Sequence, residues 1–322
     1  MKKRNLYKRL IAKTKSICKA RRIPKSFSKK NNNVFSNTKH ITIYVLKIKE
    51  KKDYRDMPDF LELVRDEIGL KRIPHFTTIN KFALRVKPLW FDALMEELLN
   101  SVYQEEAVIC SIDGTGLSLN SRSKYFETIV GKRNLFMQCN ICYENKHKLI
   151  LACRLRRKKR HESIDFQMLA KKACKRRNVS LFLQDKGYDA EKHHKFVRYE
   201  LKSKMIAPLR RHGKKINGFY RKQMQKLPTI YKKRASISEN GHSILKNSFG
   251  DVIHAKKFRT QKIEGLGKML VYDIIKVINI GYWSLLSTAD ILYKNFYTLV
   301  ICLIYGKVFV LCCWNLFVFR VF

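Results

Sequence analysis

Two acidic residues in this chain of 322 residues directly follow apolar runs, and a glycine comes soon after each. Asp113 ends the run in AVICSIDGTG (107–116), and Asp185 ends the run in VSLFLQDKG (179–187). Short apolar runs of this kind predict buried strands, and ligands of α/β sheets gather at the carboxyl ends of strands. If the two strands are neighbours, the two carboxylates repel each other unless a cation lies between them. A Lys or Arg side chain meets this need, and so does a hard divalent ion such as Mg²⁺.

A third carboxylate, Glu239, lies in the segment 231–249, which reads as a helix. Lys246 follows it by seven residues, about two helical turns, so that both side chains point the same way. A metal-binding Glu beside a phosphate-binding Lys would suit a nucleic-acid site. A solvated surface pair is the alternative interpretation of this spacing.

The charge of the chain favours a polyanionic partner. Lys and Arg total 68 against 26 Asp and Glu, which gives a net charge of +42 and a pI near 10.1. DNA or RNA is the first partner to expect from such a charge, and an anionic membrane surface is the second. A lysine-rich surface that only confers solubility is the third.

The nine cysteines do not form a metal-binding pattern. The one C-x-x-C pair, Cys139 and Cys142, lies in an apolar, strand-like run and lacks a second pair at zinc-finger spacing. An odd number of cysteines without a secretory signal predicts free thiols in a reducing cytosol.

The first third of the chain predicts an arm followed by helices. Residues 1–40 carry no acid and read as a flexible basic arm. Residues 41–104 read as a helical region with short helices and turns, in which Asp56 or Asp59 and Thr77 or Thr78 begin helices and Gly69 ends one. Such a region suits either a DNA reader of the helix-turn-helix kind or a plain helical packing module.

The pattern changes after residue 105. Apolar runs predict strands over 107–113, 134–143, 147–155, 179–185 and 204–209, of which the second and third form a hairpin. Helical segments follow over 165–177, 190–201 and 231–249. This order predicts an α/β fold with a mixed sheet and helices on its faces. Residues 281–322 form a tail whose apolar stretch, 295–322, is interrupted at Gly306 and Lys307, and each half of this stretch is shorter than the roughly 20 residues that span a bilayer.

Three motifs in this order resemble a known family. The stretch YKKRASISENGHSILK contains Tyr231, Arg234, Glu239 and Lys246 and resembles the Tyr-Arg-Glu-Lys signature of DDE transposases from bacterial and archaeal insertion sequences. SIDGTGL and LQDKGYDAE resemble the two acidic strands of that family. The likeness extends from about residue 53 to residue 280. It departs in having four residues between Arg234 and Glu239, where the family has three, and in placing Gly241 inside the helix.

The resemblance implies an RNase H-like catalytic domain over 105–280. It implies that Asp113, Asp185 and Glu239 bind two Mg²⁺ or Mn²⁺ ions, and that Tyr231, Arg234, Lys246 and Lys186 lie along the DNA. The activity would be metal-dependent cleavage and strand transfer of the ends of an insertion sequence into target DNA. A homodimer in the cytoplasm, associated with the nucleoid and not with a membrane, would carry it out.

Two other functions share these features. One is a catalytically inactive, basic DNA-binding protein derived from a transposase, and the other is an RNase H-like nuclease without strand transfer. The first differs from an active transposase in whether Glu239 reaches Asp113 and Asp185. The second differs only in the fate of the cleaved DNA.

Overall fold

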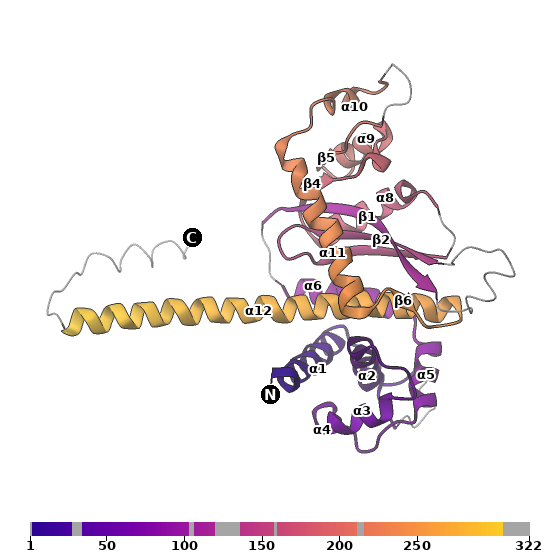
Figure 1. Cartoon of the computed structure of the whole chain (residues 1–322), viewed down its shortest axis with the longest axis vertical. Helices are drawn as coiled ribbons and strands as arrows, with labels where there is room; N and C mark the ends of the chain where they lie inside the picture. Colours follow the sequence, from indigo (N-terminus) through magenta and orange to yellow (C-terminus); the bar gives the residue numbers. More distant parts are fainter. Residues whose placement is uncertain are drawn as a thin grey trace. The chain divides into compact units, whose positions relative to one another are not determined.

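A computed structural model describes residues 2–27, 34–102, 106–119, 136–157, 160–210 and 216–304 (Figure 1). The chain divides into two units, residues 1–277 and residues 278–322. The sheet, the candidate site and the helices that position it all belong to the first unit.

The N-terminal segment is a helix and not the expected flexible arm. α1 spans Lys2–Ala20 and packs against α2, Asn37–Glu50. Leu10, Ile11 and Ile17 are buried, and their spacing places them on one face of α1. The prediction of a flexible arm was wrong because the many Lys and Arg residues on the other face of α1 outweigh the buried apolar residues in the overall composition of the segment.

The helical region expected over 41–104 is present. It contains α2, followed by α3 (Met57–Leu63), α4 (Arg65–Ile68), α5 (Phe76–Arg85) and α6 (Pro88–Asn100). Gly69 adopts a left-handed conformation after α4, as predicted for a helix end. The side chain of His75, and not of Thr77 or Thr78, caps α5, because the His75 ring accepts a hydrogen bond from the Thr77 N–H.

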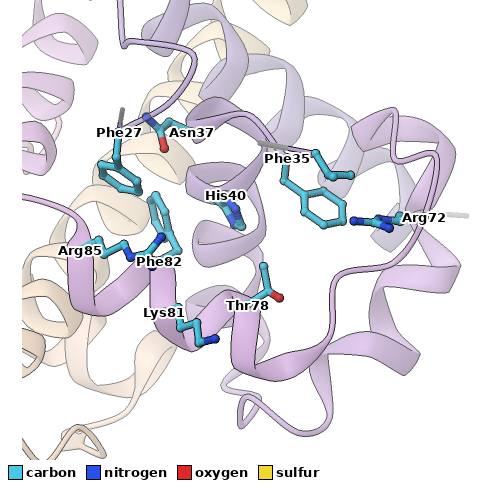
Figure 2. A pocket seen from close by; sticks show the side chains of 10 residues that line it. Phe27, Phe35, Asn37, His40, Arg72, Thr78, Lys81, Phe82 and Arg85 are labelled. Atoms are coloured by element: carbon cyan, nitrogen blue, oxygen red, sulfur yellow. The ribbon is translucent and has the colours of Figure 1, made fainter. Parts of the chain in front are cut away.

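An aromatic cluster holds α2 and α5 together (Figure 2). The His40 ring stacks on Phe82 with 4.9 Å between ring centroids, and Phe27 stacks on Trp90 at 5.4 Å. A cavity of about 260 Å³ opens beside these rings, and the cations of Arg72, Lys81 and Arg85 line it. Burial lowers the pKa of His40 to about 4, so that the stacked ring is neutral at physiological pH.

The predicted mixed sheet is confirmed. Six strands form one sheet in the order β3-β2-β1-β4-β5, and β6 pairs with the far end of β1. The strands are β1 (Val108–Leu119), β2 (Phe136–Glu144), β3 (Ile150–Arg156), β4 (Val179–Leu183), β5 (Lys204–Ile206) and β6 (Val252–Ile253). β1, β2 and β3 pair antiparallel, whereas β4 and β6 run parallel to β1 and β5 runs parallel to β4.

Helices lie on both faces of the sheet. Side chains along β2 point to the two faces in turn, and on each face they contact a helix or the residue that precedes it. Asn140 donates a hydrogen bond to Asp165, which immediately precedes α8 (Phe166–Arg176). Tyr143 points to the opposite face, where its ring contacts His242 of α11 (Lys233–Phe249). The remaining helical elements are η1 (Glu162–Asp165), η2 (Lys186–Tyr188), α9 (Glu191–Tyr199), α10 (Phe219–Gln223), η3 (Thr229–Lys232) and α12 (Phe258–Ile304).

α11 lies close to the sheet because of a glycine. It runs without a break through Asn240 and Gly241, although glycine costs a helix about 1 kcal/mol relative to alanine. A Cβ atom at Gly241 would lie 2.8 Å from the ring of Tyr143. The glycine therefore allows close contact between α11 and β2.

The apolar tail expected over 281–322 lies partly outside the described residues, which end at Ile304 within α12. Among the helices that the structure describes, none is both long and apolar enough to cross a membrane.

Replacement of Leu10 by Ala tests the packing of α1. The side chain is fully buried, so its truncation should lower the free energy of unfolding by about 2–5 kcal/mol. Lys8→Ala, which changes an exposed position of the same helix, should have almost no effect. Equal urea midpoints for the two variants would mean that α1 does not pack as described.

Replacement of Gly241 by Ala tests the close approach of α11 to β2. Overpacking costs about 1–3 kcal/mol and should outweigh the roughly 1 kcal/mol gained in helix propensity. Gly281→Ala is the matched control, because an added Cβ there meets no atom within 4 Å. Thermal unfolding should show a lower midpoint for Gly241→Ala and an unchanged or higher one for Gly281→Ala. A stabilised Gly241→Ala protein would contradict the close contact.

Candidate functional site

Asp113 lies in the middle of β1 and not at its end. The sequence predicts a strand over 107–113, whereas β1 continues to Leu119. β2 pairs with β1 from Cys110 to Ser118 and thereby extends it. β4, however, pairs only with Val108, Ile109 and Cys110, so Asp113 lies just beyond the carboxyl end of that parallel neighbour.

Asp185 lies two residues beyond β4. β1 and β4 are neighbours, which is the condition under which the sequence places the two carboxylates together, and both carboxylates lie where β4 ends. Asp185 is exposed, and its Oδ1 accepts a hydrogen bond from the Lys186 N–H at 2.7 Å, at the start of η2.

The Asp113 side chain is mostly buried, and the permanently charged guanidinium of Arg234 lies close to it. Its Oδ2 lies 3.6 Å from an Arg234 guanidinium nitrogen and 4.0 Å from His242 Nε2. Burial raises the pKa of Asp113 above its ordinary value, and the charge of Asp185 raises it further, although Arg234 and the Gly114 N–H oppose this shift. Burial also lowers the pKa of His242 to about 4, which leaves that ring neutral. The site thus holds more negative than positive charge close to Asp113 and Asp185.

Glu239 reaches this site only through Arg234. The Arg234 Nη2 donates a hydrogen bond to Glu239 Oε1 at 3.0 Å, while its Nη1 faces Asp113. The side chain of Glu239 is 62% exposed. The guanidinium therefore links the two carboxylates that the resemblance assigns to metal ions.

Glu162, in η1, is a fourth carboxylate that the sequence did not single out. Burial, and after it the charge of Asp113, raises the pKa of Glu162, and Asp185 contributes to the same shift. Its carboxyl group occupies the space where Gly114 would carry a Cβ atom, and it accepts a weak hydrogen bond of 3.5 Å from the Tyr188 hydroxyl. Glu162 follows a basic run and belongs to no apolar pattern, so no sequence signal placed it here.

Three of the four expected DNA-contacting residues lie close to the carboxylates. Arg234 pairs with Asp113, and Lys186 follows Asp185 directly. Burial raises the pKa of Tyr231, Arg234 opposes this shift, and the charges of Asp185 and Asp113 add to it, so the tyrosine belongs to the same charged environment. Lys246 lies further along α11, near His242, whose pKa it helps to lower.

The donor atoms suit a hard divalent cation. Carboxylate oxygens are the preferred ligands of Mg²⁺, which needs only one or two of them and completes its shell with water and phosphate. Asp113 and Asp185 supply two such groups where β4 ends. A cation between the two carboxylates would offset the repulsion between their charges. Across the described parts of the chain, no three His, Cys, Asp or Glu side chains come together closely enough to hold a metal ion. The set of three ligands therefore stays a prediction.

Comparison with known proteins agrees with this fold. The structure is similar to a piggyBac transposase seen by cryo-electron microscopy in a synaptic complex with hairpin DNA, with a TM-score of 0.50 and 9% sequence identity. The likeness covers 87% of this chain and 75% of the other chain, and at this identity it concerns the fold alone. No functionally curated protein matched the sequence.

The sequence profile of the Transposase DDE domain matches residues 104–274, which is more than half of the 322-residue chain and includes β1, β4 and α11. The chain belongs to the family of transposases with a DDE domain.

Proposed function

We propose that this protein catalyses metal-dependent cleavage of DNA and strand transfer at the ends of an insertion sequence. The observation that carries the proposal is the position of Asp113 and Asp185 together where β4 ends, within a domain of the transposase family. Asp185 has no ion-pair partner among the described residues, although the net charge of the chain is +42. Its exposed carboxylate, next to that of Asp113, is suited to bind a cation.

Asp113, Asp185 and Glu239 would hold two Mg²⁺ or Mn²⁺ ions. When bound, such ions activate a water molecule and stabilise the leaving oxygen of phosphoryl transfer. For Glu239 to take part, Arg234 must release its carboxylate, and a DNA phosphate is a suitable new partner for the guanidinium fork. Tyr231, Lys186 and Lys246 would bind the backbone on either side of the scissile phosphate.

DNA at the ends of the element and at the target is the proposed substrate, and a homodimer is the proposed active assembly. The net charge supports a polyanionic substrate. The similar solved structure is itself a complex of a transposase with hairpin DNA.

One observation favours a second function, that of an inactive DNA-binding protein. The Glu239 carboxylate is paired with Arg234 and is largely exposed, so it does not reach Asp113 and Asp185 in this arrangement. An RNase H-like nuclease would use the same carboxylates and would differ only in leaving the cleaved strand untransferred.

Asp185→Asn should abolish strand cleavage and leave the affinity for DNA unchanged or slightly higher. The amide keeps the shape of the carboxylate and loses the charge that attracts a cation. Cleavage with Mg²⁺ or Mn²⁺ on a gel, and DNA binding by fluorescence anisotropy, measure the two effects.

Asp189→Asn is the matched control for this variant. Asp189 lies four residues further on and is fully buried, and it pairs with Arg221 at 2.8 Å. Its replacement should lower the thermal midpoint, whereas Asp185→Asn should not. Cleavage that survives in Asp185→Asn would contradict a catalytic role for this site.

Asp113→Asn should stabilise the protein in the absence of divalent metal. The pKa of Asp113 is raised in the folded state, so the stability linked to its protonated form is complete below the unfolded pKa and is lost as pH rises through the folded pKa. At pH 7 the charged group opposes folding, and its removal should add about 0.5–2 kcal/mol to the free energy of unfolding.

The gain from Asp113→Asn should shrink as the pH falls through the raised folded-state pKa of Asp113, and it should vanish below the unfolded value of about 4, where the carboxyl is neutral in both states. Mg²⁺ should raise the urea midpoint of the wild-type protein and have little effect on the variant. A variant that is less stable than wild type at pH 7 would show that Asp113 is a structural ion-pair partner of Arg234.

A further inference from the structure

A second charged surface lies at the β3 edge of the sheet, away from the cations that the resemblance assigns to DNA. It is a groove of about 740 Å³ between β3, α6, α8 and α12. We call it the β3 groove and define it by the six cationic residues that line it: Arg154, Arg156, Arg157, Arg160, Lys172 and Lys262.

Carboxylates neutralise only part of this charge. Asp165 pairs with Arg154 and Arg156, and Asp92 pairs with Lys172. Within the described chain, no carboxylate pairs with the side chains of Arg157, Arg160 or Lys262. Arg157 and Arg160 are exposed. The groove therefore offers two free guanidinium groups and one ammonium group to an anionic ligand.

Arg160 connects the β3 groove to the candidate active site. It also lines a second cavity, of about 370 Å³, together with Gly114, Glu162 and Gly187. Gly114 follows Asp113 directly, and Gly187 lies two residues after Asp185. Gln138, which is buried, holds the Arg160 backbone from both sides. Its Nε2 donates to the Arg160 carbonyl at 2.8 Å, and its Oε1 accepts from the Arg160 N–H at 2.9 Å. The buried Gln138 side chain thus fixes the backbone of Arg160, a residue that lines both cavities.

The walls of the groove also carry apolar side chains at the surface. Leu89 is 74% exposed, and Met168 and Phe258 are 40% and 38% exposed. Guanidinium groups bind phosphate in a bidentate manner, and exposed apolar groups contact the sugars and bases of a nucleic acid. Cations and apolar side chains both line the groove, which suits a sugar-phosphate backbone better than a small anion.

We propose that the β3 groove binds the backbone of the DNA segment that enters or leaves the candidate active site, with Arg160 at the junction. The choice of DNA rests on the proposed function. The charge and shape of the groove are independent of it.

The test compares two double variants of the full chain. Arg157→Gln/Arg160→Gln removes two charges from the β3 groove and keeps side-chain length. Lys195→Gln/Lys204→Gln removes two exposed charges at the opposite edge of the sheet, on α9 and β5. The affinity for a fluorescent duplex is measured by anisotropy over a series of salt concentrations, with EDTA present so that no cleavage takes place.

The groove variant should bind about 10–100-fold more weakly at ~0.1 M salt, and its plot of log affinity against log salt should be shallower by about 2, or about 1 for each lost phosphate contact. The control variant should keep the slope of the wild type. Equal slopes for all three proteins would overturn the proposal, and so would equal losses in both variants, which would mean that net charge alone matters.

A second measurement needs no variant. Phenylglyoxal modifies free arginine side chains, and mass spectrometry shows whether bound DNA protects Arg157 and Arg160 in the wild-type protein. Modification that is unchanged by DNA would overturn the proposal. Groove variants that bind DNA normally but lose affinity for polyglutamate would also overturn it, because they would identify an acidic polypeptide as the ligand.

These outcomes are separate from those of the proposed function. Cleavage that survives in Asp185→Asn would end the catalytic proposal and leave the DNA contacts of the β3 groove standing. Unchanged DNA binding by the groove variant would end this inference and leave the catalytic proposal standing.

Discussion

β1 and β4 pair in parallel at only three positions, Val108–Val179, Ile109–Leu181 and Cys110–Phe182, and the candidate site depends on where this pairing ends. Beyond it, β1 continues alongside β2, whereas the chain after β4 turns into η2. Asp113 therefore keeps a fixed strand position, while Asp185 lies on a short turn beside it.

Three other acids close to the sheet differ from this pair in being held by cations. Asp165 and Asp189 are buried and are held by arginines, and Asp92 pairs with Lys172 and Arg176. Asp113 shares one arginine with Glu239, and no cation pairs with Asp185 in the described chain. The single arginine beside Asp113 contrasts with the six cations that line the β3 groove.

Two glycines allow the layers around the site to come close. Gly114 leaves room for the Glu162 carboxyl group on one face of the sheet, and Gly241 lets α11 lie against Tyr143 on the other. Because α11 carries Arg234 and Glu239, its distance from the sheet decides whether the guanidinium reaches Asp113. The close approach of a helix thus couples packing in the core to the charge balance of the site.

The sequence by itself determined the existence of β1 to β5, the hairpin of β2 and β3, the end of α4 at Gly69 and the position of Asp113 and Asp185 after apolar strands, whereas the pairing of β1 with β4 brought the two acids together. The features that the sequence determined follow from local patterns. The helix α1, the length of β1, and the contacts of Glu162 and Gly241 came only from the tertiary structure. An apolar face hidden among lysines, a strand extended by its partner, a carboxylate brought from another segment and a glycine needed for close packing all depend on residues distant in sequence. Local periodicity can reveal an apolar face such as that of α1, but it does not say which distant residues cover that face.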